Sequence, residues 1–106
     1  MHVPLELEFR NVPRARGLER LLKEKMRKIT RLCNTINRCQ IIVEKHDLDK
    51  ERDNPYGVQI QISFSNRREI VVSLKPADNK IDENLYTVVS NAFEILRSNM
   101  INVIEE

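Results

Sequence analysis

The sequence has no tryptophan, only two glycines, two cysteines and two histidines, and no long uninterrupted apolar run. A bilayer-spanning helix needs about 20 predominantly apolar residues, so the short apolar runs predict no membrane segment. Gly17 and Gly57 stand alone, which excludes a glycine-rich phosphate-binding loop. No charged leader followed by an apolar core opens the chain, so we expect no secretory signal and a cytoplasmic location.

The two cysteines, Cys33 and Cys39, are six positions apart. One stands near the end of a predicted helix and the other opens a predicted strand. In a cytoplasmic protein, two such cysteines favour reduced, largely buried thiols over a disulfide. Their spacing also differs from that of a zinc half-site.

The histidines offer little for catalysis. His2 lies next to the N-terminus, and His46 lies beside Asp47 and near Asp49 in a polar segment. A histidine among carboxylates can bind a metal or act as a base, but it can equally belong to a solvated loop. We favour the loop, because no further ligand follows at a regular spacing. The sequence therefore predicts no catalytic residue, no metal or cofactor site, no small-molecule substrate and no enzymatic activity.

Apolar periodicity predicts six elements within one domain, residues 1–106, whose length and 41% hydrophobic content suit a soluble globular protein. The expected strands cover residues 5–10, 39–44, 58–64 and 70–74. One expected helix runs from residues 14–17 to about Cys33, with Leu32, Cys33 and Ile36 counted on the apolar face. A second long helix is marked by spaced apolar residues from Leu85 to Met100.

The order of these elements is β-α-β-β-β-α, and every strand has one apolar and one mostly polar face. We therefore predict an α+β fold: a four-stranded mixed sheet with both helices packed on one side. If the first two strands are adjacent, they are parallel through a right-handed crossover. The expected core includes Leu22, Ile29, Ile60, Ile62, Val72, Val89 and Leu96.

Charge is strongly segregated along the chain. Residues 10–38 carry ten basic and two acidic side chains, a net charge of +8. Residues 82–106 carry one basic and five acidic side chains, a net charge of −4. The overall charge of +2 hides this asymmetry. A basic stripe on one helix is typical of a surface that binds a polyanion, most commonly nucleic acid, although it can also be a solvated face with few acids.

At about 100° per residue, the first helix turns four basic side chains away from the sheet and places Lys28 on its flank. These four are Arg20, Lys23, Arg27 and Arg31. Lys25 projects into the apolar sector, where its stem covers core surface or its ammonium reaches a ligand. Because the polar sheet face lacks aromatic side chains for stacking bases, we expect RNA recognition through the backbone, led by the helices.

Four segments carry a family resemblance: residues 4–12 (PLELEFRNV), 22–29 (LKEKMRKI), 36–44 (INRCQIIVE) and 83–93 (ENLYTVVSNAF). Together they resemble the family of ribosome hibernation-promoting factors and ribosome-associated inhibitor A. The resemblance implies a fold similar to double-stranded-RNA-binding domains. It also implies docking on small-subunit rRNA in the channel for mRNA and tRNA, so that translation is silenced under stress.

Family contacts with rRNA come from basic positions on both helices, and the matching positions here are Lys25, Lys28 and Arg31 on the first helix. The second helix offers Arg97, while Ile95, Ser98, Asn102, Ile104 and Glu106 occupy positions near which the family usually has lysine or arginine. The chain also lacks the C-terminal extension that dimerises long members, so no extension-mediated ribosome pairing is expected.

A second hypothesis is a diverged module that binds a protein partner, or a second copy of itself, through its C-terminal helix. Ile101, Val103 and Ile104 lie on more than one side of that helix. An apolar helix end needs burial, either in its own core or against another chain.

Overall fold

A computed structural model describes residues 3–45, 56–75 and 84–105, the last three as backbone only. Its elements are β1 (Leu5–Arg10), α1 (Arg16–Leu32), β2 (Ile36–Lys45), β3 (Tyr56–Phe64), β4 (Glu69–Leu74) and α2 (Leu85–Glu105). This is the predicted β-α-β-β-β-α order. His2 and the His46 segment with Asp47 and Asp49 lie outside the described residues.

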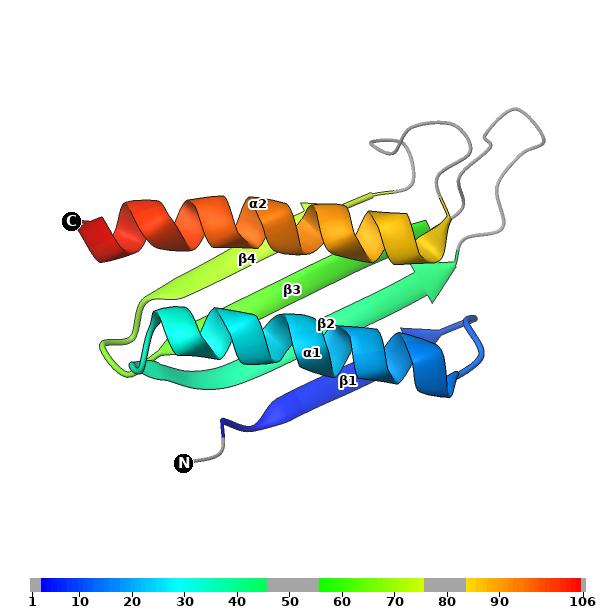
Figure 1. Ribbon diagram of the computed structural model, residues 1–106, viewed down its shortest axis with the longest axis horizontal. Coiled ribbons are helices and arrows are strands. Elements are labelled where there is room, and N and C mark those ends of the chain that lie inside the picture. Colours follow the sequence, from blue (N-terminus) through cyan, green and yellow to red (C-terminus); the bar gives the residue numbers. More distant parts are fainter. Residues whose placement is uncertain (1–2, 46–55, 76–83, 106) are drawn as a thin grey trace.

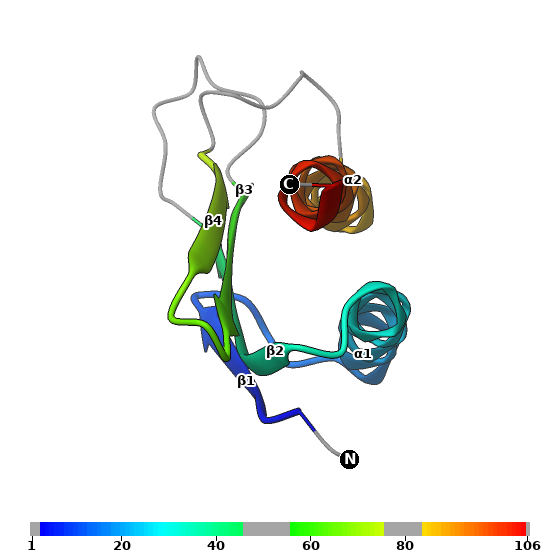
Figure 2. The ribbon, with the colours of Figure 1, turned by 90° about the vertical axis from the view of Figure 1, so that its left-hand side faces the viewer.

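The four strands form one sheet in the order β1-β2-β3-β4. β1 and β2 are parallel, with Leu5 opposite Cys39, and the other two pairings are antiparallel. Seen end-on in Figure 2, the sheet forms one layer and both helices lie on the same side of it. Figure 1 shows α1 and α2 side by side across the strands and running in the same direction. The predicted mixed sheet with two helices on one face is therefore confirmed.

The core lies between the sheet and the two helices. Alternate strand residues point into it, because successive side chains of a strand face opposite sides. On β3 these are Val58, Ile60, Ile62 and Phe64. All seven residues predicted for the core are buried: Leu22, Ile29, Ile60, Ile62, Val72, Val89 and Leu96.

The two helices begin differently. Asn84 caps α2: its side-chain oxygen accepts hydrogen bonds from the Thr87 backbone N–H at 2.9 Å and hydroxyl at 3.1 Å. α1 has no side-chain cap, and its first turn carries Glu19, which pairs with Arg14 at 3.0 Å. A carboxylate in the first turn complements the positive end of the helix dipole.

Several sequence-based expectations were wrong in detail. β2 begins at Ile36, so this residue is a buried strand residue rather than part of the apolar face of the preceding helix. Leu32, expected on that face, is 40% exposed because it lies on the flank of α1. Cys33 was expected to be largely buried, yet it is half-buried, since the helix ends there and the chain turns towards β2.

Both cysteines are free thiols, as predicted, and Cys39 is buried. Within residues 3–45, 56–75 and 84–105, no cluster of three or more His, Cys, Asp and Glu side chains could hold a metal ion. None of the helices in these ranges is long and apolar enough to cross a membrane.

Candidate nucleic-acid interface

The basic side chains of α1 are left without acidic partners. They are Arg16, Arg20, Lys23, Lys25, Arg27, Lys28 and Arg31. In the described part of the chain none of them forms an ion pair. The positive charge of this helix is therefore available to a ligand.

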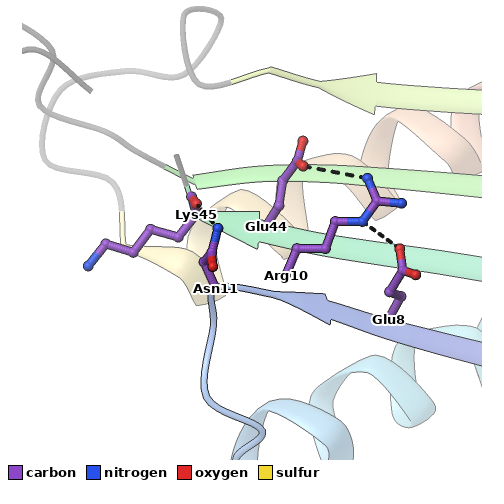
Figure 3. Close-up of polar contacts among 5 residues, drawn as sticks. All are labelled: Glu8, Arg10, Asn11, Glu44 and Lys45. Carbon is purple, nitrogen blue, oxygen red and sulfur yellow. Dashed lines mark hydrogen bonds and ion pairs between the residues drawn. The ribbon is translucent and has the colours of Figure 1, made fainter. Parts of the chain in front are cut away.

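Three other basic residues of segment 10–38 are compensated. Arg38 pairs with Glu6 at 2.8 Å, and Arg14 pairs with Glu19. Arg10 pairs with Glu8 at 2.6 Å and with Glu44 at 4.0 Å. Figure 3 shows the Arg10 side chain between these two carboxylates. Outside α1, a ligand would therefore meet less positive charge than the net +8 of residues 10–38 implies.

A groove of about 340 Å³ lies between the C-terminal half of α1 and the middle of α2. Its lining contains four basic residues, one acid and three apolar residues: Lys25, Lys28, Arg31, Arg97, Glu94, Ile29, Leu32 and Phe93. The fold thus brings together four of the seven residues predicted to bind RNA. In sequence, Arg97 lies 66 positions beyond Arg31, so only the packing of the helices makes them neighbours.

We call this groove with its eight lining residues the interhelical groove. Ile29 and Phe93, both buried, form its apolar base, while Lys28, Arg31 and Arg97 are exposed around it. Lys25 is half-buried, which fits a lysine whose stem lies along apolar surface while its ammonium reaches outwards. Cations around an apolar base suit a ligand that is anionic along its length.

Glu94 is the one acid among the groove-lining residues, and sequence reasoning missed it. It stands three positions before Arg97 on α2, a spacing that places two side chains on the same helix face. This spacing could have indicated from the sequence that Glu94 lies beside Arg97. No ion pair joins the two in the described structure, so Arg97 keeps its charge for a ligand, although the nearby carboxylate weakens the local positive potential.

The other three predicted residues, Arg20, Lys23 and Arg27, do not line the interhelical groove. They lie along a separate hollow of about 520 Å³ on the outer side of α1, together with Arg16, Glu19 and Glu24. We call it the outer hollow. The predicted α1 residues are therefore divided between two surfaces of the helix. Arg16 was not predicted, although its position one turn before Arg20 could have indicated it.

The helix-free face of the sheet has a different character. Its polar side chains interact with one another: besides the arginine pairs above, the Gln61 amide donates a hydrogen bond to Glu69 at 3.4 Å. The three aromatic residues of the described strands, Phe9, Tyr56 and Phe64, share the alternating phase of the core-facing positions and so face the helices. The described strands therefore offer no stacking platform on this face, as predicted.

No family model matches the sequence, and no curated protein matches it significantly. Solved structures do match in shape. A ribosomal subunit interface protein from Coxiella burnetii superposes with a TM-score of 0.75 at 13% identity, over 98% of this chain and 100% of the other. The N-terminal domain of Protein Y from Thermus thermophilus gives a TM-score of 0.63 at 14% identity, over 93% and 94% of the two chains. The three proteins share one fold. At these identities the likeness concerns architecture and does not extend to individual side chains.

Proposed function

We propose that this protein is a member of the hibernation-factor family that associates with the ribosome in the cytoplasm. In this proposal it binds small-subunit rRNA through the interhelical groove, occupies the channel for mRNA and tRNA, and so inhibits translation. It acts by occupancy and needs no catalysis or cofactor. The fold shared with a ribosomal subunit interface protein supports this function, as does the resemblance of the four sequence segments.

The observation that carries the proposal is the convergence of Lys25, Lys28, Arg31 and Arg97 around one groove. Each cation that neutralises a phosphate releases condensed counterions, so such a surface binds RNA tightly at low salt. Lys25 is already half-buried, so it loses less side-chain entropy on binding than a fully exposed lysine would. With no aromatic side chain exposed in the groove, recognition rests on the RNA backbone and its shape.

Co-sedimentation with purified small ribosomal subunits tests the proposal. The protein should pellet with subunits at low salt and leave them as salt rises. The double variant Lys28→Gln/Arg97→Gln removes one groove cation from each helix and should lose most of this binding at intermediate salt. Both side chains are exposed, so the variant should fold normally, which circular dichroism checks.

The matched control is Arg10→Gln/Arg38→Gln, which removes the same two charges from the helix-free face of the sheet. It should co-sediment like the wild type. Salt-insensitive binding, or no binding at any salt, contradicts the proposal.

One observation favours the protein-partner hypothesis: Ile95 and Ile101 of α2 are 41% and 39% exposed. Ile101→Asp would place a charge in an apolar contact and should abolish partner binding, because an unpaired buried charge is costly. Under the rRNA proposal the same substitution leaves co-sedimentation with subunits largely unchanged. The two functions therefore give opposite results with one variant.

A further inference from the structure

The outer hollow has a regular construction of its own. Its cations, Arg16, Arg20, Lys23 and Arg27, follow one another at steps of four, three and four residues. These steps place them on one side of the helix in a continuous line. At about 1.5 Å per residue the line is roughly 16 Å long, enough to follow several phosphates of one RNA strand.

The two surfaces of α1 face different directions. At about 100° per residue, the mean direction of the outer-hollow cations is roughly 110° around the helix from that of Lys25, Lys28 and Arg31. An RNA segment lying along the interhelical groove would therefore leave the outer hollow uncovered.

An acid separates the two surfaces over the middle of α1. Glu24 stands one turn from Arg20 on one side and one turn from Lys28 on the other, and it is exposed. In the described structure it forms no ion pair with either residue. A phosphate backbone crossing between Arg20 and Lys28 would meet this carboxylate, and like charges repel, whereas no acid lies between Arg27 and Arg31 one turn further along. Over the middle of α1 the charge pattern thus favours two backbone segments over one that wraps around the helix.

The carboxylates of the outer hollow do not cancel its charge. Glu19 is held by Arg14 at 3.0 Å and is only 23% exposed, and Arg14 itself lies over the Phe9 ring at 4.9 Å. Four cations stand against Glu19 and Glu24, and the ion pair already neutralises one of these acids. A net positive line remains for an anionic ligand.

We propose that α1 holds two separate RNA backbone segments at once, one in the interhelical groove and one along the outer hollow. The inference rests on the proposed function and goes beyond it, since it specifies a folded RNA in which two helical segments lie on either side of one protein helix. A helix with its side chains is about 10–12 Å wide, which sets the approximate gap between the two segments.

Counting short RNA duplexes per protein tests this inference. A 10-base-pair RNA duplex is added in excess over the protein at low salt. Such a duplex is too short to occupy both surfaces, because they face different directions around α1. Native mass spectrometry, checked by sedimentation velocity, should find two duplexes on the wild-type protein. Arg20→Gln/Arg27→Gln should retain only one, and so should Lys28→Gln/Arg97→Gln. The control Arg10→Gln/Arg38→Gln removes equal charge from the far face and should still bind two.

The outcomes separate this inference from the function on which it rests. If the wild type binds a single duplex that only Lys28→Gln/Arg97→Gln removes, the second site is wrong and the groove function stands. If Arg20→Gln/Arg27→Gln still binds two duplexes, the outer hollow is equally ruled out. If no duplex binds at any salt, the proposed function itself fails.

Discussion

Arg38 of β2 and Glu6 of β1 form an ion pair in which Nη2 of Arg38 lies 2.8 Å from both carboxylate oxygens. Both side chains are about half-exposed, at 55% and 51%. Exposed pairs of this kind contribute between 0 and about 1 kcal/mol to stability, so this pair matters little for folding. Its effect is on the charge map: together with the pairs of Arg10 it compensates arginines of the helix-free face, whereas the basic residues of α1 have no acidic partner in the described structure.

The packing of Ile60 gives the first prediction. This residue is fully buried in β3, between Ile41 of β2 and Val72 of β4. Ile60→Ala should lower the free energy of unfolding by about 2–5 kcal/mol, through lost burial and the cavity left behind. Urea denaturation measures the change. The exposed neighbour Gln59→Ala is the control and should change stability by less than about 0.5 kcal/mol; a loss below about 1 kcal/mol at Ile60 contradicts the core assignment.

Gly17 gives a prediction of opposite sign. It lies in the first turn of α1, and a Cβ added there would stand 3.2 Å from the Tyr86 hydroxyl, the far end of a 47% exposed side chain that can rotate away. Alanine is favoured over glycine in helices by about 1 kcal/mol, so Gly17→Ala should raise the free energy of unfolding by roughly 0.5 kcal/mol.

Gly57→Ala is the informative contrast. A Cβ at Gly57 would stand 3.2 Å from the Leu74 carbonyl oxygen and 3.3 Å from a Glu44 carboxylate oxygen. The sheet backbone cannot yield as a surface tyrosine can, so this variant should be destabilised by about 1–3 kcal/mol. Equal losses of stability for Gly17→Ala and Gly57→Ala would mean that Tyr86 of α2 cannot move away from a Cβ at position 17 of α1.

The buried thiol of Cys39 makes stability depend on pH in the alkaline range. Desolvation by burial raises its pKa from 9.0 to about 11, because the thiolate is poorly solvated in the core. Between these values the unfolded chain loses the thiol proton while the folded chain keeps it. The free energy of unfolding should therefore fall as pH rises from about 9 to 11, and be unaffected by this group below pH 9.

Urea titrations between pH 8 and 11 measure this fall. Cys39→Ala should show a shallower decline than the wild type, since the titrating group is gone, whereas Cys33→Ala should keep the wild-type slope. Alkylation of the folded protein at pH 8 should label half-buried Cys33 well before buried Cys39. If stability declines equally with pH in all three proteins, burial does not raise the pKa of the Cys39 thiol.

The fold was largely predictable from sequence because apolar and polar residues alternate along its strands. Val58 to Phe64 follows period two without interruption, and the structure places every apolar member of this run in the core. The errors fall where periodicity is ambiguous. Ile36 fits the helical pattern of the preceding residues and also pairs with Phe64 across the sheet, and the long-range pairing decides its state.

The candidate site was predictable only in composition. Sequence periodicity identified the basic residues of α1, but it could not show that Arg97 joins three of them at one groove while Arg20 and Arg27 lie on another surface. That division depends on how α2 packs beside α1. Nor could sequence reveal that Arg38 is neutralised by Glu6, a partner 32 positions away on another strand.

Lys28 provides the most direct test of how the groove binds RNA. It is exposed, lines the interhelical groove and has no acidic partner in the described structure, so Lys28→Ala should leave stability nearly unchanged. If its ammonium neutralises one phosphate, affinity should fall almost equally for RNAs of unrelated sequence. The dependence of log K on log salt should become shallower by about one unit, since one fewer contact releases counterions.

Fluorescence anisotropy across a salt series, with two RNA duplexes of different sequence, measures both effects of Lys28→Ala. Arg38→Ala removes the same charge from the helix-free face and should leave the salt slope at its wild-type value. A loss at Lys28 confined to one RNA sequence would indicate a base contact instead. An unchanged slope would mean that the Lys28 ammonium does not meet a phosphate, and the groove would then have to bind RNA through its remaining cations alone.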